Sequence, residues 1–296
     1  MEKQEKVQLL LKEGFGVLTI NNPVVMGAHV LSSEVLLDLK QRLEECREND
    51  GVKFVIITGE GRHFSIGANV KEIWEIAKEG DRQKALELLA RANEVANLIQ
   101  DLNKPTVAAI DGFCLGGGNE IAMACTARIA TEEAVFGQPE INLGIMPGMG
   151  GTQRLPRLVG LNEALKITLM GNMITAVKAW ELGLVDKVVP RKELRSQAKE
   201  SGLSLYREGL FCYLEKKMFP DVTVLNDENF QAILKTKPPD AVSAILKAVR
   251  FGTQLPLKEG LKLEQELFAD VVVTDSARKG LAKFLKIELG NNMSGD

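Results

Sequence analysis

Histidine and cysteine are scarce in this chain of 296 residues, and their scarcity limits the chemistry open to it. The two histidines are His29 and His63, and none of the four cysteines forms a C-x-x-C pair. This leaves too few ligands for a zinc site or a disulfide framework, so we expect no metal. No histidine lies near Cys114 or Cys125 to act as a base, and we expect both cysteines to pack as small apolar residues.

Long apolar stretches and runs of one charge are also missing. The net charge is -3 and the basic residues are spread along the chain, which argues against a nucleic-acid partner. No stretch is long enough to cross a bilayer, so we expect no membrane association. Residues 1–6 have neither the apolar region of a secretory signal nor the Arg-rich character of a transit peptide. A cytoplasmic location is the prediction.

Strand and helix patterns alternate through the first half of the chain. Helical periodicity marks residues 31–48, with Ser32 or Ser33 as the cap, and residues 82–102. Short apolar runs typical of buried strands lie at residues 15–20, 54–58 and 106–110. This order predicts an α/β core built from repeated ββα units.

The second half of the sequence is mostly helical. Thr175 and Gly183 have the residue types that begin and end a short helix. The segment at about 201–240 combines several prolines with weak periodicity and fits neither pattern, and a periodic helical tail resumes at about Ala241.

The most informative stretch places three glycines, Gly116 to Gly118, between an apolar strand and a helix. Glycines there are costly unless something must approach the backbone closely. Gly117 would open the helix, which leaves its N–H group unpaired at the positive end of the helix dipole. Glu120 follows within a turn, and Glu140 follows a rigid Gln-Pro pair. Such N–H groups and paired carboxylates are what oxyanion stabilisation and proton transfer need. An ordinary turn flanked by two surface glutamates is the alternative.

Four motifs, in this order, resemble the crotonase (enoyl-CoA hydratase/isomerase) superfamily. They are FSIGANVKE at 64–72, DGFCLGGGNE at 111–120, FGQPEINLGIMPGMGGT at 136–152 and AWELGLVDKVV at 179–189. The resemblance covers roughly residues 8–190 and the helical tail at 241–287. The extra segment looks closest to the hydratase part of multifunctional fatty-acid oxidation α-subunits, which continue into a dehydrogenase domain. No G-x-G-x-x-G follows a strand here, so we expect no NAD use.

The resemblance implies a fold and an activity. The fold is a spiral of ββα units over residues 1–200, which holds the catalytic site, with a C-terminal helical region over 201–296. The activity is that of an enoyl-CoA hydratase, a hydro-lyase that reversibly adds water in the syn sense to a 2-enoyl-CoA, giving a 3-hydroxyacyl-CoA, as in fatty-acid β-oxidation. No cofactor is implied, because CoA is part of the substrate.

The resemblance also implies roles for individual residues. The backbone N–H groups of Ala68 and Gly117 would form the oxyanion hole. Glu120 would take a proton from the attacking water, and Glu140 would give a proton to the α-carbon. The substrate and its CoA part would be contacted by Ala28, Ala68, Asn69, Val70, Lys71, Gly116, Gly117, Phe268 and Lys283. A lone lysine such as Lys71 is otherwise more often a solvated surface charge.

Related activities compete with hydration. Isomerases of the superfamily often keep only the carboxylate that matches Glu140, so the pair favours a hydratase, although it also suits double-bond isomerisation or hydration of a cyclic dienoyl-CoA. A binding protein, including an RNA-binding one, would lack a catalytic glutamate or carry a basic cluster, and the sequence shows neither. Members of the superfamily commonly form homotrimers or hexamers, and we expect the same here.

One departure from the family pattern lies after the first strands. Many members read Pro-x-x-x-Asn-Ala-Leu, whereas this chain has Gly27-Ala28-His29 at the end of that motif. We interpret His29 as a residue of a surface turn rather than as part of the acyl or CoA site. The walls of the acyl pocket are expected from residues 72–100 and from the 201–240 segment.

Overall fold

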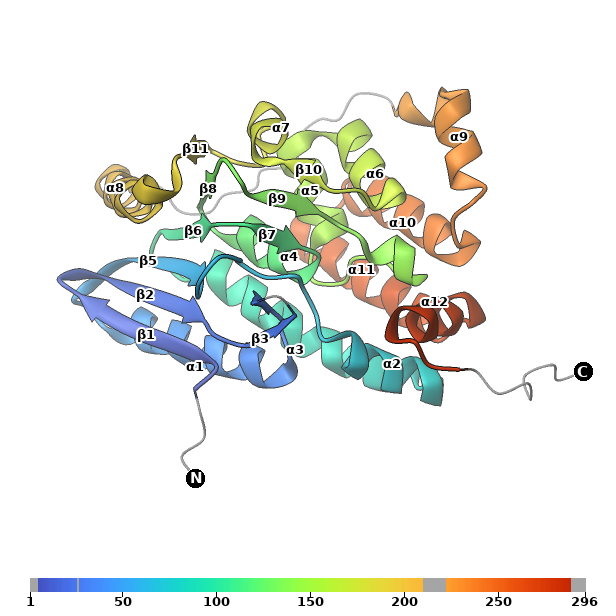
Figure 1. Ribbon diagram of the computed structural model, residues 1–296, viewed down its shortest axis with the longest axis horizontal. Coiled ribbons are helices and arrows are strands. Elements are labelled where there is room, and N and C mark those ends of the chain that lie inside the picture. The colour runs from blue at the N-terminus through green and yellow to red at the C-terminus, as the bar shows by residue number, and fades with distance from the viewer. Residues whose placement is uncertain (1–4, 26, 210–221, 289–296) are drawn as a thin grey trace, which may run out of the picture.

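A six-stranded sheet forms the centre of the protein (Figure 1). The computed structural model describes residues 5–25, 27–209 and 222–288. The first strand of the sheet pairs antiparallel with its neighbour, and all the other pairs are parallel. In spatial order the strands are β1 (Val7–Lys12), β2 (Gly14–Ile20), β5 (Val52–Gly59), β6 (Thr106–Ile110), β8 (Ala127–Thr131) and β11 (Lys187–Val189).

A second, smaller sheet lies beside the first and carries the site described below. Its order is β10 (Ile174–Thr175), β9 (Val135–Gly137) and β7 (Phe113–Leu115), and a separate pair is formed by β3 (Pro23–Val25) and β4 (Ala28–His29). After β6 the chain enters β7 and then helix α4 (Gly117–Ala124). After β8 it enters β9 and then the 3₁₀ helix η1 (Glu140–Leu143). This repeat is the predicted ββα spiral.

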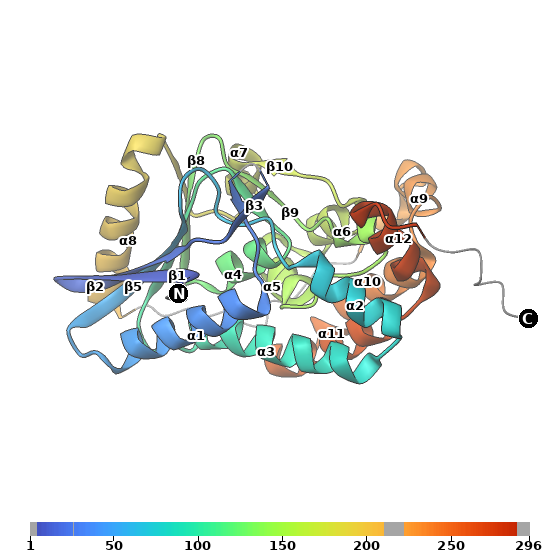
Figure 2. The same ribbon diagram turned by 60° about the horizontal axis from the view of Figure 1, so that its bottom comes forward.

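Helices cover both faces of the central sheet, which explains the short apolar strands (Figure 2). Along β5, Val55 and Ile57 pack in the large core under α1, α3 and α4, whereas Phe54 and Ile56 pack with Ala198 of α8 on the other face. A strand that is buried on both faces has no polar side to alternate with. The helices of these two layers are α1 (Ser33–Glu48), α3 (Arg82–Gln100) and α8 (Leu194–Glu208), together with α4.

The C-terminal helices pack against the end of the core that contains the second sheet (Figure 1). α11 contacts α3 and α5, and α12 contacts α2. These helices and their neighbours are α2 (Val70–Glu79), α5 (Gly151–Val159), α6 (Leu161–Met170), α7 (Ala176–Glu181), α9 (Glu228–Leu234), α10 (Pro239–Gly252), α11 (Leu257–Val272) and α12 (Asp275–Leu285), with the 3₁₀ helices η2 (Arg191–Glu193) and η3 (Val224–Asn226). The described helices include none with both the length and the apolar composition needed to cross a bilayer.

The local sequence signals are largely confirmed. Ser32 caps α1 and Thr175 caps α7, each by accepting a hydrogen bond from a backbone N–H of the first turn. Gly183 lies just past the end of α7 with a positive φ of 81°. Cys114 and Cys125 are fully buried, as expected of small apolar side chains.

The 201–240 segment contains parts of several elements. α8 extends to Glu208, η3 and α9 follow residue 222, and α10 begins at Pro239. Residue 200, where we predicted the two regions to meet, therefore lies inside α8. Residues 210–221 of this segment lie outside the described part of the chain.

Candidate active site

The glycine run turns the chain sharply from β7 into α4. Gly116 has φ 52° and ψ -126°, a conformation that a side chain would strain, and its N–H donates to the carbonyl of Gly137 at 2.9 Å. A Cβ atom at Gly116 would lie 2.9 Å from Oε1 of Glu140. Glycine is required here because β7, β9 and the Glu140 carboxyl group approach one another closely.

Two backbone N–H groups come together beside this turn. Gly67 has φ 97°, and a Cβ atom there would lie 3.0 Å from the nitrogen of Gly117. A Cβ atom on Gly117 would lie 3.4 Å from the nitrogen of Ala68. Within the described residues, neither the Ala68 nor the Gly117 N–H donates a hydrogen bond to another protein atom. The two groups predicted as the oxyanion hole are therefore adjacent and available.

Glu120 lies one turn into α4 and is 3% exposed. Its Oε1 accepts hydrogen bonds from the N–H groups of Met149, at 2.8 Å, and Gly151, at 2.6 Å. Burial raises the pKa of Glu120 to about 7, although the two N–H groups and Arg154 act in the opposite direction. The carboxyl group can thus exchange a proton near neutral pH.

Glu140 begins η1, directly after the rigid Pro139. Its Oε2 is buried and, among the described residues, has no hydrogen-bond partner. Burial raises the pKa of Glu140 well above its usual value, and the charges of Glu120 and Glu264 raise that pKa further. Burial, the unpaired Oε2 and the neighbouring carboxylates together favour the protonated form of Glu140.

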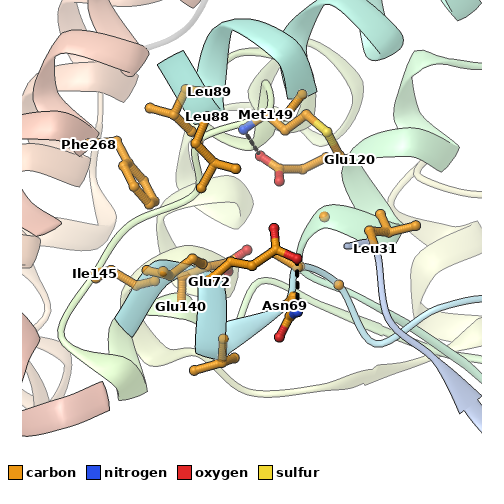
Figure 3. A pocket seen from close by; sticks show the side chains of 18 of the residues that line it. Leu31, Asn69, Glu72, Leu88, Leu89, Glu120, Glu140, Ile145, Met149 and Phe268 are labelled. Atoms are coloured by element: carbon orange, nitrogen blue, oxygen red, sulfur yellow. Dashed lines mark hydrogen bonds between the residues drawn. The ribbon is translucent and has the colours of Figure 1, made fainter. Parts of the chain in front are cut away.

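Both glutamates line one largely apolar cavity with an empty volume of about 840 Å³, which includes its open mouth (Figure 3). This size is in the range of small-molecule sites. Ala68, Asn69, Val70, Gly116, Gly117 and Phe268 line it as well. The apolar walls come from several elements and include Leu31, Leu36, Ile73, Leu88, Leu89, Ala92, Ile145, Met146 and Met149.

The predicted origin of the walls is confirmed for residues 72–100 and is wrong for the described residues of the 201–240 segment. Residues between 72 and 100 contribute from two helices, because Gly80, with φ 67°, ends α2 and Asp81 caps α3. No described residue of the 201–240 segment lines the cavity. The C-terminal wall is Phe268 of α11, because α11 packs against α3 whereas α9 packs against α6.

The remaining substrate-binding candidates lie outside the cavity lining. Ala28 is buried in β4. Lys71 is exposed at the start of α2, and Lys283 is exposed on α12, the helix that packs against α2. The two lysines therefore lie on neighbouring helices. Lys71 directly follows the pocket-lining residues Asn69 and Val70.

The prediction that His29 belongs to a surface turn is wrong. His29 is 1% exposed, its Nδ1 accepts from the N–H of Asn22 at 3.1 Å, and its Nε2 lies 2.6 Å from the carbonyl oxygen of Glu60. Nε2 therefore carries the hydrogen and donates it. The imidazole joins two loops by pairing the N–H of Asn22 and the carbonyl group of Glu60, and it does not line the cavity.

Two further carboxylates near the cavity were not identified from the sequence. Glu72 of α2 lines the cavity and accepts hydrogen bonds from Ser33 and Asn69. Glu264 of α11 is fully buried and binds the turn that also binds Glu120. A signal for Glu264 was present, because Gly260, Glu264 and Phe268 recur every fourth residue and so lie on one buried helix face.

The comparison with known proteins settles the family. Residues 11–218 match the family described as enoyl-CoA hydratase/isomerase. The chain belongs to this family. It is 35% identical over 280 residues to a probable enoyl-CoA hydratase of Bacillus subtilis, covering 95% of each chain. It is 41% identical to the glyoxysomal fatty acid β-oxidation multifunctional protein MFP-a of Brassica napus, with 91% of this chain matching 37% of that longer protein.

A solved structure agrees with these matches. The crystal structure of an enoyl-CoA hydratase from Bacillus anthracis has a TM-score of 0.62 and 30% identity, covering 95% of this chain and 96% of that one. The superfamily resemblance, including the likeness to multifunctional proteins, and the fold class are therefore confirmed. The prediction of an enzyme, a hydro-lyase, is confirmed at the level of the family.

Proposed function

We propose that the protein is an enoyl-CoA hydratase that adds water to a 2-enoyl-CoA and forms a 3-hydroxyacyl-CoA. One observation carries this proposal: the carboxyl groups of the buried Glu120 and the half-buried Glu140 face a single apolar cavity, beside the N–H groups of Ala68 and Gly117 that have no acceptor among the described residues. An isomerase needs one carboxyl group to move a proton between two carbons. Hydration needs a base for water and an acid for carbon, which matches the pair.

The two glutamates divide the proton transfers. Glu120 accepts a proton from water as the water oxygen bonds to the β-carbon, and the electrons of the double bond move onto the thioester oxygen. The N–H groups of Ala68 and Gly117 stabilise this enolate oxygen, and losing one such donor costs about 10²–10³ in rate. Glu140 then gives its proton to the α-carbon. The raised pKa values suit these roles, because Glu120 can be ionised near neutrality while Glu140 stays protonated.

The CoA part of the substrate would bind at the mouth of the cavity. Asn69 and Val70 line the cavity where α2 begins, and Lys71 follows them. Lys283 lies on the adjacent α12. Two exposed ammonium groups on neighbouring helices provide positive charge for the CoA phosphates. Ala28 is proposed to contact the substrate through the backbone of β4.

We also propose that the chain forms a homotrimer or hexamer, acts in the cytoplasm and serves fatty-acid β-oxidation.

The decisive test is hydration of crotonyl-CoA, followed by the loss of absorbance of the conjugated thioester, for the wild type and for Glu120→Gln. We expect rapid loss of absorbance in the wild type and a fall in kcat of at least about 10³-fold in the variant. The protein would be an isomerase, and the proposal would fail, if it converted a 3-enoyl-CoA but did not hydrate crotonyl-CoA. In that case Glu120→Gln should leave the rate with the 3-enoyl-CoA unchanged. If the protein hydrated only a cyclic dienoyl-CoA, the proposed reaction would stand but the proposed substrate would be wrong.

A further inference from the structure

The backbone that leads from η1 into the first turn of α5 donates its N–H groups alternately to two carboxylates. Met149 and Gly151 donate to Oε1 of Glu120, at 2.8 and 2.6 Å. Gly150 donates to Oε1 of Glu264 at 2.6 Å, and Thr152 donates to Oε2 of Glu264 at 2.7 Å. We call these four residues the 149–152 turn.

The carboxyl group of Glu264 is held by three hydrogen bonds from two residues of this turn. It is 0% exposed, and the Thr152 hydroxyl adds a third hydrogen bond, at 2.5 Å to Oε2. Gly150, between the two donors to Glu120, has φ 105°, and this conformation is secured by its bond to Glu264. A buried carboxylate is costly unless its hydrogen bonds repay its desolvation.

We infer that Glu264 is a positioning residue for the proposed hydration. It fixes the 149–152 turn so that the N–H groups of Met149 and Gly151 hold the Glu120 carboxylate at the reacting water. This inference rests on the proposed function, because it assigns Glu264 a role through Glu120 and not a contact with the substrate. Glu264 does not line the cavity.

Glu264 also affects the pKa of a proposed catalytic group, Glu140, through its charge. The charged groups that face this cluster are Glu120 from α4, Glu140 from η1 and Arg154 from α5. The charge that Glu264 carries once it ionises, at a pKa of about 8, is one of the causes that raise the pKa of Glu140. Removing that charge should therefore lower the pKa of Glu140 and make the proposed acid lose its proton at a lower pH.

Glu264→Gln is the direct test, because glutamine keeps the shape but replaces one accepting oxygen with an NH₂ group that cannot accept from the turn. We expect kcat for crotonyl-CoA to fall about 10–100-fold while KM changes less than about threefold. We also expect the alkaline limb of the kcat/KM profile to move to lower pH. A merely structural role would not move that limb. Glu266→Gln, an exposed position on the same helix that pairs with Arg82, is the matched control.

Thr152 provides a second variant if Glu264→Gln folds poorly. Thr152→Val removes the hydroxyl bond to Glu264 but keeps the backbone donor, and it should lower kcat in the same direction by a smaller factor. Thr152→Ser restores the hydroxyl and should restore kcat. Equal kcat and an unmoved alkaline limb in both Glu264→Gln and Thr152→Val would overturn the inference.

Hydrogen exchange of the 149–152 amides gives a readout that does not depend on activity. Faster exchange at Gly150 and Thr152 in Glu264→Gln, but not in Glu266→Gln, would support the inference, and unchanged exchange would refute it. If the wild type hydrates crotonyl-CoA while Glu264→Gln changes none of these readouts, only the inference fails. If the wild type hydrates no enoyl-CoA, the proposed function fails, and faster exchange would still show that Glu264 holds the turn.

Discussion

At the scale of single residues, the carboxyl group of Glu120, one of the proposed catalytic pair, is held by backbone donors from a distant part of the chain. Glu120 and Glu140 could be predicted because each follows a local signal, a glycine-rich turn in one case and a Gln-Pro pair in the other. The donors to Glu120 come from Met149 and Gly151, some thirty residues further along the chain. Such contacts depend on the packing of distant elements, which local patterns do not encode.

His29 was wrongly assigned to a surface turn, because the groups that bind its two ring nitrogens come from other loops, at Asn22 and Glu60. Replacing His29 with alanine should lower the free energy of unfolding by about 2–4 kcal/mol, since it leaves the Asn22 N–H and the Glu60 carbonyl group unpaired and opens a cavity. Urea denaturation of the wild type and the variant measures the difference. A change below about 0.5 kcal/mol would be typical of an exposed side chain and would contradict the buried role.

At the scale of elements, the predicted strands and N-terminal caps were confirmed, whereas the partner of each helix could not be predicted. A periodic pattern shows which face of a helix is buried but not what covers it. Part of the pocket wall was therefore expected from the 201–240 segment, but no described residue of that segment lines the cavity. Phe268 of α11, which the resemblance implied as a substrate contact, does line it. Phe268 also packs beside Gly148, where a Cβ atom would lie 2.8 Å from its ring.

Shortening this side chain should change both substrate selection and stability. Phe268→Ala would enlarge the cavity, so we expect kcat/KM for a longer 2-enoyl-CoA to rise about tenfold relative to crotonyl-CoA. The free energy of unfolding should fall by about 3 kcal/mol because a buried ring is lost. Steady-state rates with two acyl lengths and urea denaturation check the two effects.

Phe251→Ala provides the matched control for this experiment. Phe251 lies on α10, is 59% exposed and does not line the cavity. Its loss should leave the ratio of the two substrates and the unfolding free energy nearly unchanged. An equal effect of both substitutions would mean that Phe268 acts only through general packing.

At the scale of the whole molecule, the buried carboxyl groups make stability depend on pH. The pKa of Glu120 is raised from 4.5 to about 7, and that of Glu264 is raised from 4.5 to about 8. A raised folded-state pKa favours the protonated form, so its stabilisation is fully present below pH 4.5 and is lost as the pH rises through the folded-state value. We therefore expect the free energy of unfolding to fall between pH 5 and pH 8, by up to about 1.4 kcal/mol per pH unit for each group.

Urea denaturation at several pH values measures this dependence. Glu264→Gln cannot ionise at position 264, so its stability should fall less steeply than that of the wild type over the same interval. Parallel pH dependences for the two proteins would contradict a raised pKa at Glu264. An increase in wild-type stability towards pH 8 would contradict it as well.

The alternating hydrogen bonds of the 149–152 turn also have a consequence for biosynthesis. A nascent chain that has left the ribosome only as far as α8 already contains Ala68, Gly117, Glu120 and Glu140. It still lacks Glu264 and Phe268, so two of the four backbone donors in the turn have no acceptor and one wall of the cavity is open. Catalytic competence should therefore appear late in synthesis, when α11 has emerged and docked onto a core that is already folded.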